Sequence, residues 1–112
     1  AACPSAVVQP PLGPVGDFAT VRRARNIVVS VSTFAWLAAW LSEATRIHLP
    51  VYGIFNPEQF RQIDLLPLAD QRYIYYRFPV HWAVPLPSLS ASFVELGRSW
   101  RIASPRELVR YP

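Results

Sequence analysis

Residues 26–50 read NIVVSVSTFAWLAAWLSEATRIHLP and give the strongest indication of the fold in this sequence. Residues 26–30 are rich in β-branched side chains without polar alternation, which predicts a strand covered on both faces. Residues 34–43 are rich in Ala and Leu and apolar almost all round, which predicts a buried helix. Residues 46–49 predict a second strand, which Pro50 ends. A strand, a helix and a strand joined by short links predict a right-handed parallel βαβ crossover.

The segment before this stretch predicts another turn of the same winding. Residues 6–8 give a short buried-strand signal, and the Pro- and Gly-rich residues 10–14 predict a loop. Asp17 is then a candidate N-cap of a short helix. The apolar residues of this helix share one face and are Phe18, Val21 and Ala24. The basic residues are expected to face outward and are Arg22, Arg23 and Arg25. Residues 1–50 are therefore expected to form a Rossmann-like βαβαβ core.

The character of the chain changes after Pro50. The predicted elements are a short helix over 57–62 capped by Asn56, an aromatic strand over 73–78, an extended Pro-rich loop over 79–87, a last strand over 100–102 and a short helix opened by an S-x-x-E capping box over 104–107. Residues 51–112 are expected to be an irregular extension of the core. The whole is one small α/β domain, or the C-terminal fragment of a larger protein.

Composition narrows the function classes. The chain has no methionine, so we expect Ala1 to follow processing or truncation, and all eleven basic residues are arginine, which indicates a GC-rich bacterial genome. The net charge of +4 raises nucleic acid as a partner. The arginines are scattered, however, with one cluster at residues 22–25 and no aromatic RNA-binding signature, so we expect no nucleic-acid partner unless they converge on one face.

The sequence contains no pattern typical of a metal site or of a membrane-spanning segment. The single cysteine, Cys3, excludes an internal disulfide and a cysteine-based metal site, and His48 and His81 have no carboxylate at ligand spacing. We interpret His48 as a structural residue of a buried strand. Asp64 and Asp70 have no recognisable acid/base partner. No apolar stretch approaches the length that spans a bilayer, and no signal-peptide pattern opens the chain, so a cytoplasmic location is the default.

One turn is a candidate ligand-binding site. It lies where the first strand of the βαβ unit ends and its helix begins, at Ser30-Val31-Ser32-Thr33-Phe34. Ligands of open α/β sheets bind outside the carboxyl ends of the strands. Ser32 or Thr33 is expected to cap the helix, leaving first-turn amides free for an anion, with the Ser30 hydroxyl as a further donor. A second interpretation stays open, in which the turn only closes a helix end. The absence of a Gly-rich loop argues against a P-loop or a dinucleotide fingerprint.

Residues 24–41, ARNIVVSVSTFAWLAAWL, resemble the C-terminal motif of GDP-fucose-dependent fucosyltransferases, notably the α-1,2 group. In that motif a strand ends in S-x-S-(S/T)-F-S-W-W-A-A-(Y/W)-L, and the strand at residues 46–50 is also similar to the family. The resemblance covers about a quarter of the chain. Ala35 and Leu37 stand where the family has Ser and Trp, which weakens the assignment to fucose as such.

The resemblance implies one lobe of a GT-B fold that holds a nucleotide-diphosphate sugar, GDP-fucose being the first candidate. By position, Ser32, Thr33 and Phe34 match the residues that hold the donor diphosphate, Ser30 ends the strand beneath it, and Asp17 resembles an acidic residue that precedes the motif. No metal cofactor is implied. The family's Arg-containing motif has no counterpart here, so the missing N-terminal lobe is an expected partner, together with a glycan acceptor. The alternative is a non-enzymatic α/β interaction module.

Overall fold

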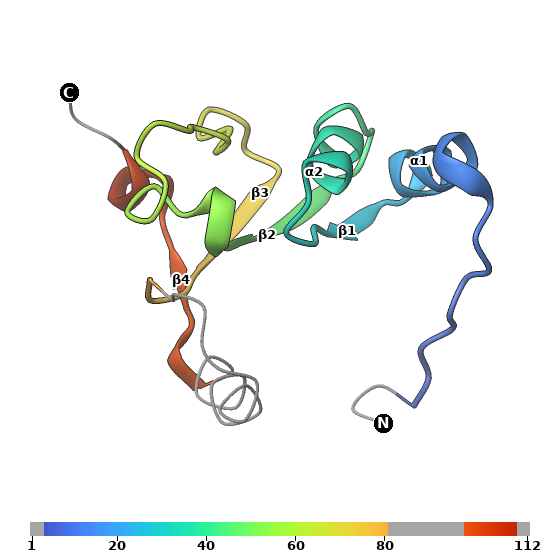
Figure 1. Ribbon diagram of the computed structural model, residues 1–112, viewed down its shortest axis with the longest axis horizontal. Helices are drawn as coiled ribbons and strands as arrows, with labels where there is room; N and C mark the ends of the chain where they lie inside the picture. The colour runs from blue at the N-terminus through green and yellow to red at the C-terminus, as the bar shows by residue number, and fades with distance from the viewer. Residues whose placement is uncertain (1–3, 81–97, 110–112) are drawn as a thin grey trace.

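The computed structural model describes residues 4–80 and 98–109, and these form one mixed, mostly parallel sheet with two α-helices (Figure 1). The elements in chain order are α1 (Gly13–Arg23), β1 (Asn26–Val28), α2 (Thr33–Trp40), β2 (Arg46–Val51), the 3-10 helix η1 (Gly53–Phe55), β3 (Tyr73–Arg77), β4 (Arg101–Ala103) and the 3-10 helix η3 (Pro105–Leu108). The strand order is β1-β2-β3-β4. Strands β1, β2 and β3 are parallel, and β4 pairs antiparallel with β3. The parallel β1-α2-β2 unit confirms the prediction of an α/β fold with parallel strands around a helix. The prediction that Pro50 ends the second strand is wrong, because β2 continues through Pro50 to Val51.

The hydrophobic core lies on the face of the sheet that α1 and α2 cover. Both helices lie on the same side of the sheet in Figure 1. In β2 the residues alternate, so that Ile47, Leu49 and Val51 are fully buried while His48 and Pro50 are half-buried. The register places Tyr73 and Tyr75 of β3 beside Ile47 and Leu49 on the core side. One face of the sheet therefore carries the packing.

The opposite face is open along β1 and β4. Val28 is 80% exposed and Ile102 is 63% exposed. The prediction of a strand covered on both faces is wrong: β1 shows an alternating pattern, in which Ile27 is buried and Val28 is not, and it ends at Val28. The reason is that both described helices cover the same face, so that within residues 4–80 and 98–109 the β-branched run packs against one layer of helices.

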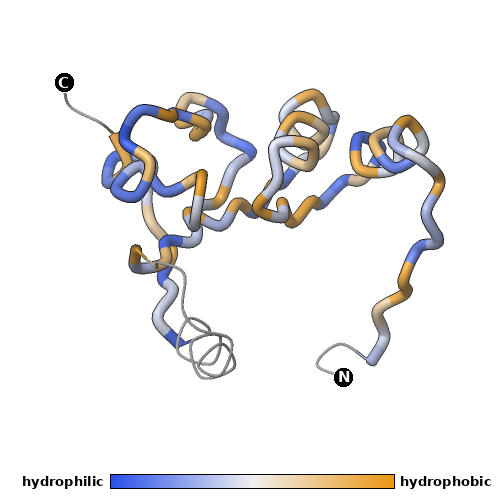
Figure 2. The backbone as a smooth tube through the Cα atoms, viewed as in Figure 1, coloured by the Kyte–Doolittle hydropathy of each residue, from blue (hydrophilic) through white to orange (hydrophobic). Residues whose placement is uncertain are grey.

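Helix α2 is less buried than its composition predicted. Figure 2 shows it in orange and pale colours, without the deep blue of charged residues. Only Ala38 and Ala39 are fully buried, and Leu37 and Trp40 stay 40% and 47% exposed. The prediction of a buried helix is wrong because the sheet covers one side of α2. Trp40 stacks on Trp36, as their i,i+4 spacing indicates, at 6.0 Å between ring centroids.

Helix α1 begins earlier than predicted. It starts at Gly13, with Pro14 in its first turn, so that Asp17 is inside the helix and is not its N-cap. The Asp17 carboxylate accepts a hydrogen bond from the Leu12 amide at 3.0 Å. Residues 6–8 form no strand, and Val7 is 90% exposed. The predicted βαβαβ core is thus an α1-β1-α2-β2 unit.

The second half of the chain follows the predictions in part. Strands β3 and β4 lie within one residue of their predicted positions at 73–78 and 100–102. The predicted helix over 57–62 is a series of turns, although the Asn56 side chain accepts from the Glu58 amide as a capping residue does. Ser104 makes no side-chain cap, and η3 is a single 3-10 turn. The predicted loop 79–87 lies mostly outside the described residues.

We expect Tyr75→Phe to leave the stability unchanged or to raise it by up to about 1 kcal/mol. The Tyr75 side chain is 1% exposed, and its hydroxyl has no hydrogen-bond partner among the described residues. Burial also raises the pKa of Tyr75. Removing an unpaired buried hydroxyl removes a desolvation cost. Urea unfolding measures the change, and a loss above about 1 kcal/mol would mean that this hydroxyl has a partner in solution.

Candidate functional site

The turn between β1 and α2 is built by local hydrogen bonds. The Val29 amide donates to the His48 carbonyl at 2.9 Å and continues the pairing of β1 with β2. The Ser32 amide then donates to the Ser30 carbonyl at 2.8 Å, which turns the chain towards α2. Ser32 has an extended backbone and its hydroxyl accepts from the Ala35 amide at 3.3 Å. Ser32, one of the two predicted candidates, is therefore the N-cap of α2.

Two backbone amides of this helix end remain available. Those of Thr33 and Phe34 have no hydrogen-bond partner in the part of the chain that the structure describes, and no acidic residue lies in the first turn of α2. The Thr33 and Ser30 side chains are exposed beside them. The helix dipole adds about half a positive charge at this end. The arrangement is suited to an anion that accepts hydrogen bonds from amides and hydroxyls.

The remaining predicted site residues lie beside the turn or away from it. The Phe34 ring is 44% exposed and meets the edge of Phe18 in α1 at 5.5 Å between centroids. The Phe34 ring therefore packs between α1 and α2, while its backbone amide belongs to the turn. Asp17 precedes Phe18, but the hydrogen bond that its carboxylate makes is with Leu12. The structure thus brings Ser30, Ser32 and Thr33 together and gives Asp17 a local role in α1.

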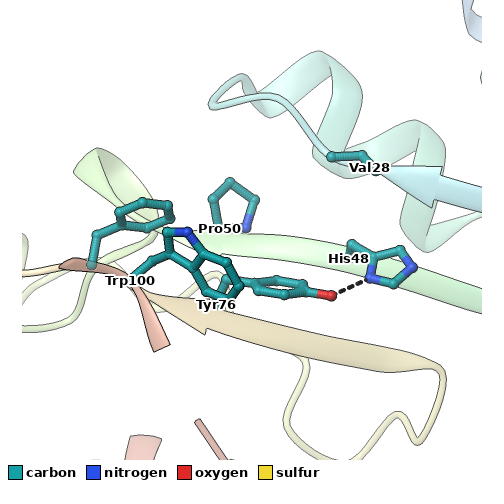
Figure 3. Close-up of a pocket in the computed structure, with 6 residues that line it drawn as sticks. Val28, His48, Pro50, Tyr76 and Trp100 are labelled. Atoms are coloured by element: carbon teal, nitrogen blue, oxygen red, sulfur yellow. Dashed lines mark hydrogen bonds between the residues drawn. The ribbon is translucent and has the colours of Figure 1, made fainter. Parts of the chain in front are cut away.

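A second candidate site lies on the open face of the sheet and includes Tyr76 and Phe78 of the aromatic segment 73–78. It is a pocket of about 340 Å³ lined by Val28, His48, Pro50, Tyr76, Phe78 and Trp100 (Figure 3). His48 is half-buried there, and its Nδ1 atom lies 2.7 Å from the Tyr76 hydroxyl. The signal that points to it is the alternation in β2, because His48 and Pro50 face away from the core.

Asp64 and Asp70 have structural roles. The Asp64 carboxylate accepts from the Leu66 amide, and Asp70 pairs with Arg72 at 2.8 Å. The hydrogen bond from the Arg72 side chain holds the pKa of Asp70 below its usual value. No group of three or more potential metal ligands occurs within residues 4–80 and 98–109. The helices of this part of the chain are too short to cross a bilayer.

Comparison with known proteins gives no family assignment. No family model, no curated protein and no solved structure matches this chain.

Proposed function

We propose that this chain is the donor-binding part of a bacterial glycosyltransferase that uses a nucleotide-diphosphate sugar, with GDP-fucose as the first candidate. The observation that carries the proposal is the turn after β1, where the amides of Thr33 and Phe34 have no hydrogen-bond partner among the described residues and the Ser30 and Thr33 side chains are exposed. The parallel β1-α2-β2 unit supports it, since ligands of such sheets bind at the carboxyl ends of the strands.

The chemistry of sugar transfer fits this arrangement. The bond between the sugar and the diphosphate breaks, and negative charge builds up on the departing diphosphate. Amides at a helix terminus and a threonine hydroxyl stabilise that charge without reorganising, which is the electrostatic contribution expected of a preorganised site. No metal ion is needed for this step. A second lobe of GT-B type would supply the glycan acceptor site and a cationic residue for the diphosphate, and we assign the reaction to the cytoplasm.

Thr33→Ala is expected to weaken GDP binding about 10- to 150-fold, because it removes one hydrogen bond to a charged group. Calorimetric titration of the chain with GDP and UDP measures the effect. Thr20→Ala is the matched control: Thr20 is an exposed threonine of α1 whose hydroxyl donates to the Gly16 carbonyl. Equal GDP affinity for wild type and Thr33→Ala, or no GDP binding by the wild type, would contradict the proposal.

A second candidate function is a non-enzymatic interaction module. The observation that favours it is the open sheet face, where Val28 is 80% exposed and Ile102 is 63% exposed. In this case Ser32 is only a helix cap, and neither GDP nor UDP raises the melting temperature. A thermal-shift assay with both nucleotides separates the two candidates, because a ligand that binds the folded state alone stabilises it.

A further inference from the structure

The pocket on the open face lies at the carboxyl half of the three parallel strands. Val28 is the last residue of β1, Pro50 is opposite Tyr76 in the register of β2 and β3, and Phe78 follows the end of β3. This is the end of an α/β sheet at which ligands bind. The pocket opens on the face away from α2, so it is a site separate from the turn.

Aromatic rings form the walls of this pocket. The ring of Tyr76 meets Trp100 at 5.5 Å between centroids with the planes 66° apart, and it meets His48 at 5.7 Å. Figure 3 shows Tyr76 extending from the side of Trp100 towards His48. The volume of about 340 Å³ falls in the range of small-molecule sites. Trp100 is 46% exposed, which leaves part of its ring free to stack on a ligand.

The lining residues also define the charge of the ligand. None of the described residues that line the pocket is Asp, Glu, Lys or Arg. A charged ligand would lose its hydration there without gaining an ion pair, which is unfavourable. The pocket therefore suits an uncharged ligand.

One polar group sets the orientation of such a ligand. The Nδ1 atom of His48 is engaged with the Tyr76 hydroxyl at 2.7 Å, and Nε2 has no partner among the described residues. When the phenol donates to Nδ1, Nε2 carries the proton and donates to the ligand. The other tautomer makes Nε2 an acceptor. A ligand ring with a hydrogen-bond donor and an acceptor side by side on its edge can bind to Nε2 in either tautomer of His48.

We propose that this pocket binds a flat, uncharged heteroaromatic ring, stacked on Trp100, in contact with Tyr76 and hydrogen-bonded at its edge to Nε2 of His48. Such a ring is available as the base of a nucleotide or as a free aromatic compound. The proposal goes beyond the diphosphate site at the turn and stands without it.

The test is an NMR titration of the ¹⁵N-labelled chain with guanosine, uridine and indole, following the indole N–H signal of Trp100. The signal is assigned from its loss in Trp100→Phe. We expect it to shift with at least one of the three probes. Trp100→Ala should weaken binding about 5- to 150-fold, the range found for one aromatic stacking partner. His48→Phe keeps a ring and removes the polar edge, and should weaken guanosine or uridine about fivefold.

The matched control is Trp40→Ala, because Trp40 lies in α2 on the other face of the sheet and is 47% exposed. It should leave the affinity for the probes unchanged. Binding of a nucleoside supports the pocket and identifies a base as the ring, and binding of indole alone supports it with a free aromatic compound. No shift with any of the three probes, or equal weakening by Trp100→Ala and Trp40→Ala, would overturn the proposal. Thr33→Ala should not change guanosine binding, so failure of the turn and failure of the pocket are distinguishable.

Discussion

Arg72→Ala is expected to lower the free energy of unfolding by about 2–4 kcal/mol, since it removes several charge-assisted hydrogen bonds from one partly buried guanidinium. Nη1 of Arg72 donates to the Ser42 carbonyl at 2.7 Å and Nη2 to the Trp40 carbonyl at 3.1 Å. The same side chain pairs with the Asp70 carboxylate at 2.8 Å. Arg72 therefore satisfies carbonyls at the C-terminus of α2, where a positive charge is favoured, and ties that end to the start of β3.

Urea unfolding measures this loss, with Arg22→Ala as the matched control. Nε of Arg22 donates to the Leu41 carbonyl at 3.3 Å, so it meets the same helix end through one long, exposed hydrogen bond. We expect Arg22→Ala to cost below about 1 kcal/mol. If the two variants lose the same stability, Arg72 does not hold α2 to the sheet.

The contribution of the Asp70–Arg72 pair depends on pH. The pKa of Asp70 is lowered in the folded chain, chiefly by the hydrogen bond from Arg72, from an ordinary value of 3.8. The stability that the carboxylate contributes is therefore complete above this ordinary value and is lost as the pH falls through the lower folded pKa. The difference in stability between wild type and Arg72→Ala should accordingly narrow in strong acid.

Leu49→Ala is expected to cost about 2–5 kcal/mol, the usual range for a fully buried leucine. Leu49 is 0% exposed at the centre of β2, the strand that pairs with both β1 and β3. Its side chain lies in the core cluster with Ile47 and Val51. Because the core occupies one face of the sheet, few other contacts compensate for the cavity. Chemical denaturation gives the change directly.

Two adjacent valines provide the control for this one-sided core. Val29 is 1% exposed and Val28 is 80% exposed, and they are neighbours in the sequence on opposite sides of the sheet. We expect Val29→Ala to cost about 1–3 kcal/mol and Val28→Ala below about 0.5 kcal/mol. Equal losses at the two positions would show that the face carrying Val28 is covered, which contradicts the open face.

The sequence predicted the elements that depend on local chemistry. The β-branched run at Ile27 predicts a strand through backbone preference, and Ser32 caps α2 through a bond to a residue three positions away. The Pro- and Gly-rich residues 10–14 predict a loop, but α1 begins at Gly13, because a proline in the first turn of a helix costs no hydrogen bond. Local signals of this kind depend only on neighbouring residues.

The features that the sequence did not predict depend on partners far along the chain. The apolar run Ile27-Val28-Val29 is compatible with a strand buried on one face and with a strand buried on both faces. The sequence alone therefore does not determine whether Val28 is covered. The pocket requires the register that places Pro50 opposite Tyr76. It also requires the pairing of β4 with β3, because Trp100 directly precedes β4. The position of the turn could be predicted because strand and helix are consecutive, whereas the pocket could not.

The most direct test of the proposed function is an NMR titration of the ¹⁵N-labelled chain with GDP. We expect the backbone amide signals of Thr33 and Phe34 to shift most, because these amides at the start of α2 have no partner in the described part of the chain. Unchanged Thr33 and Phe34 amides at millimolar GDP, or shifts confined to other segments, would contradict it.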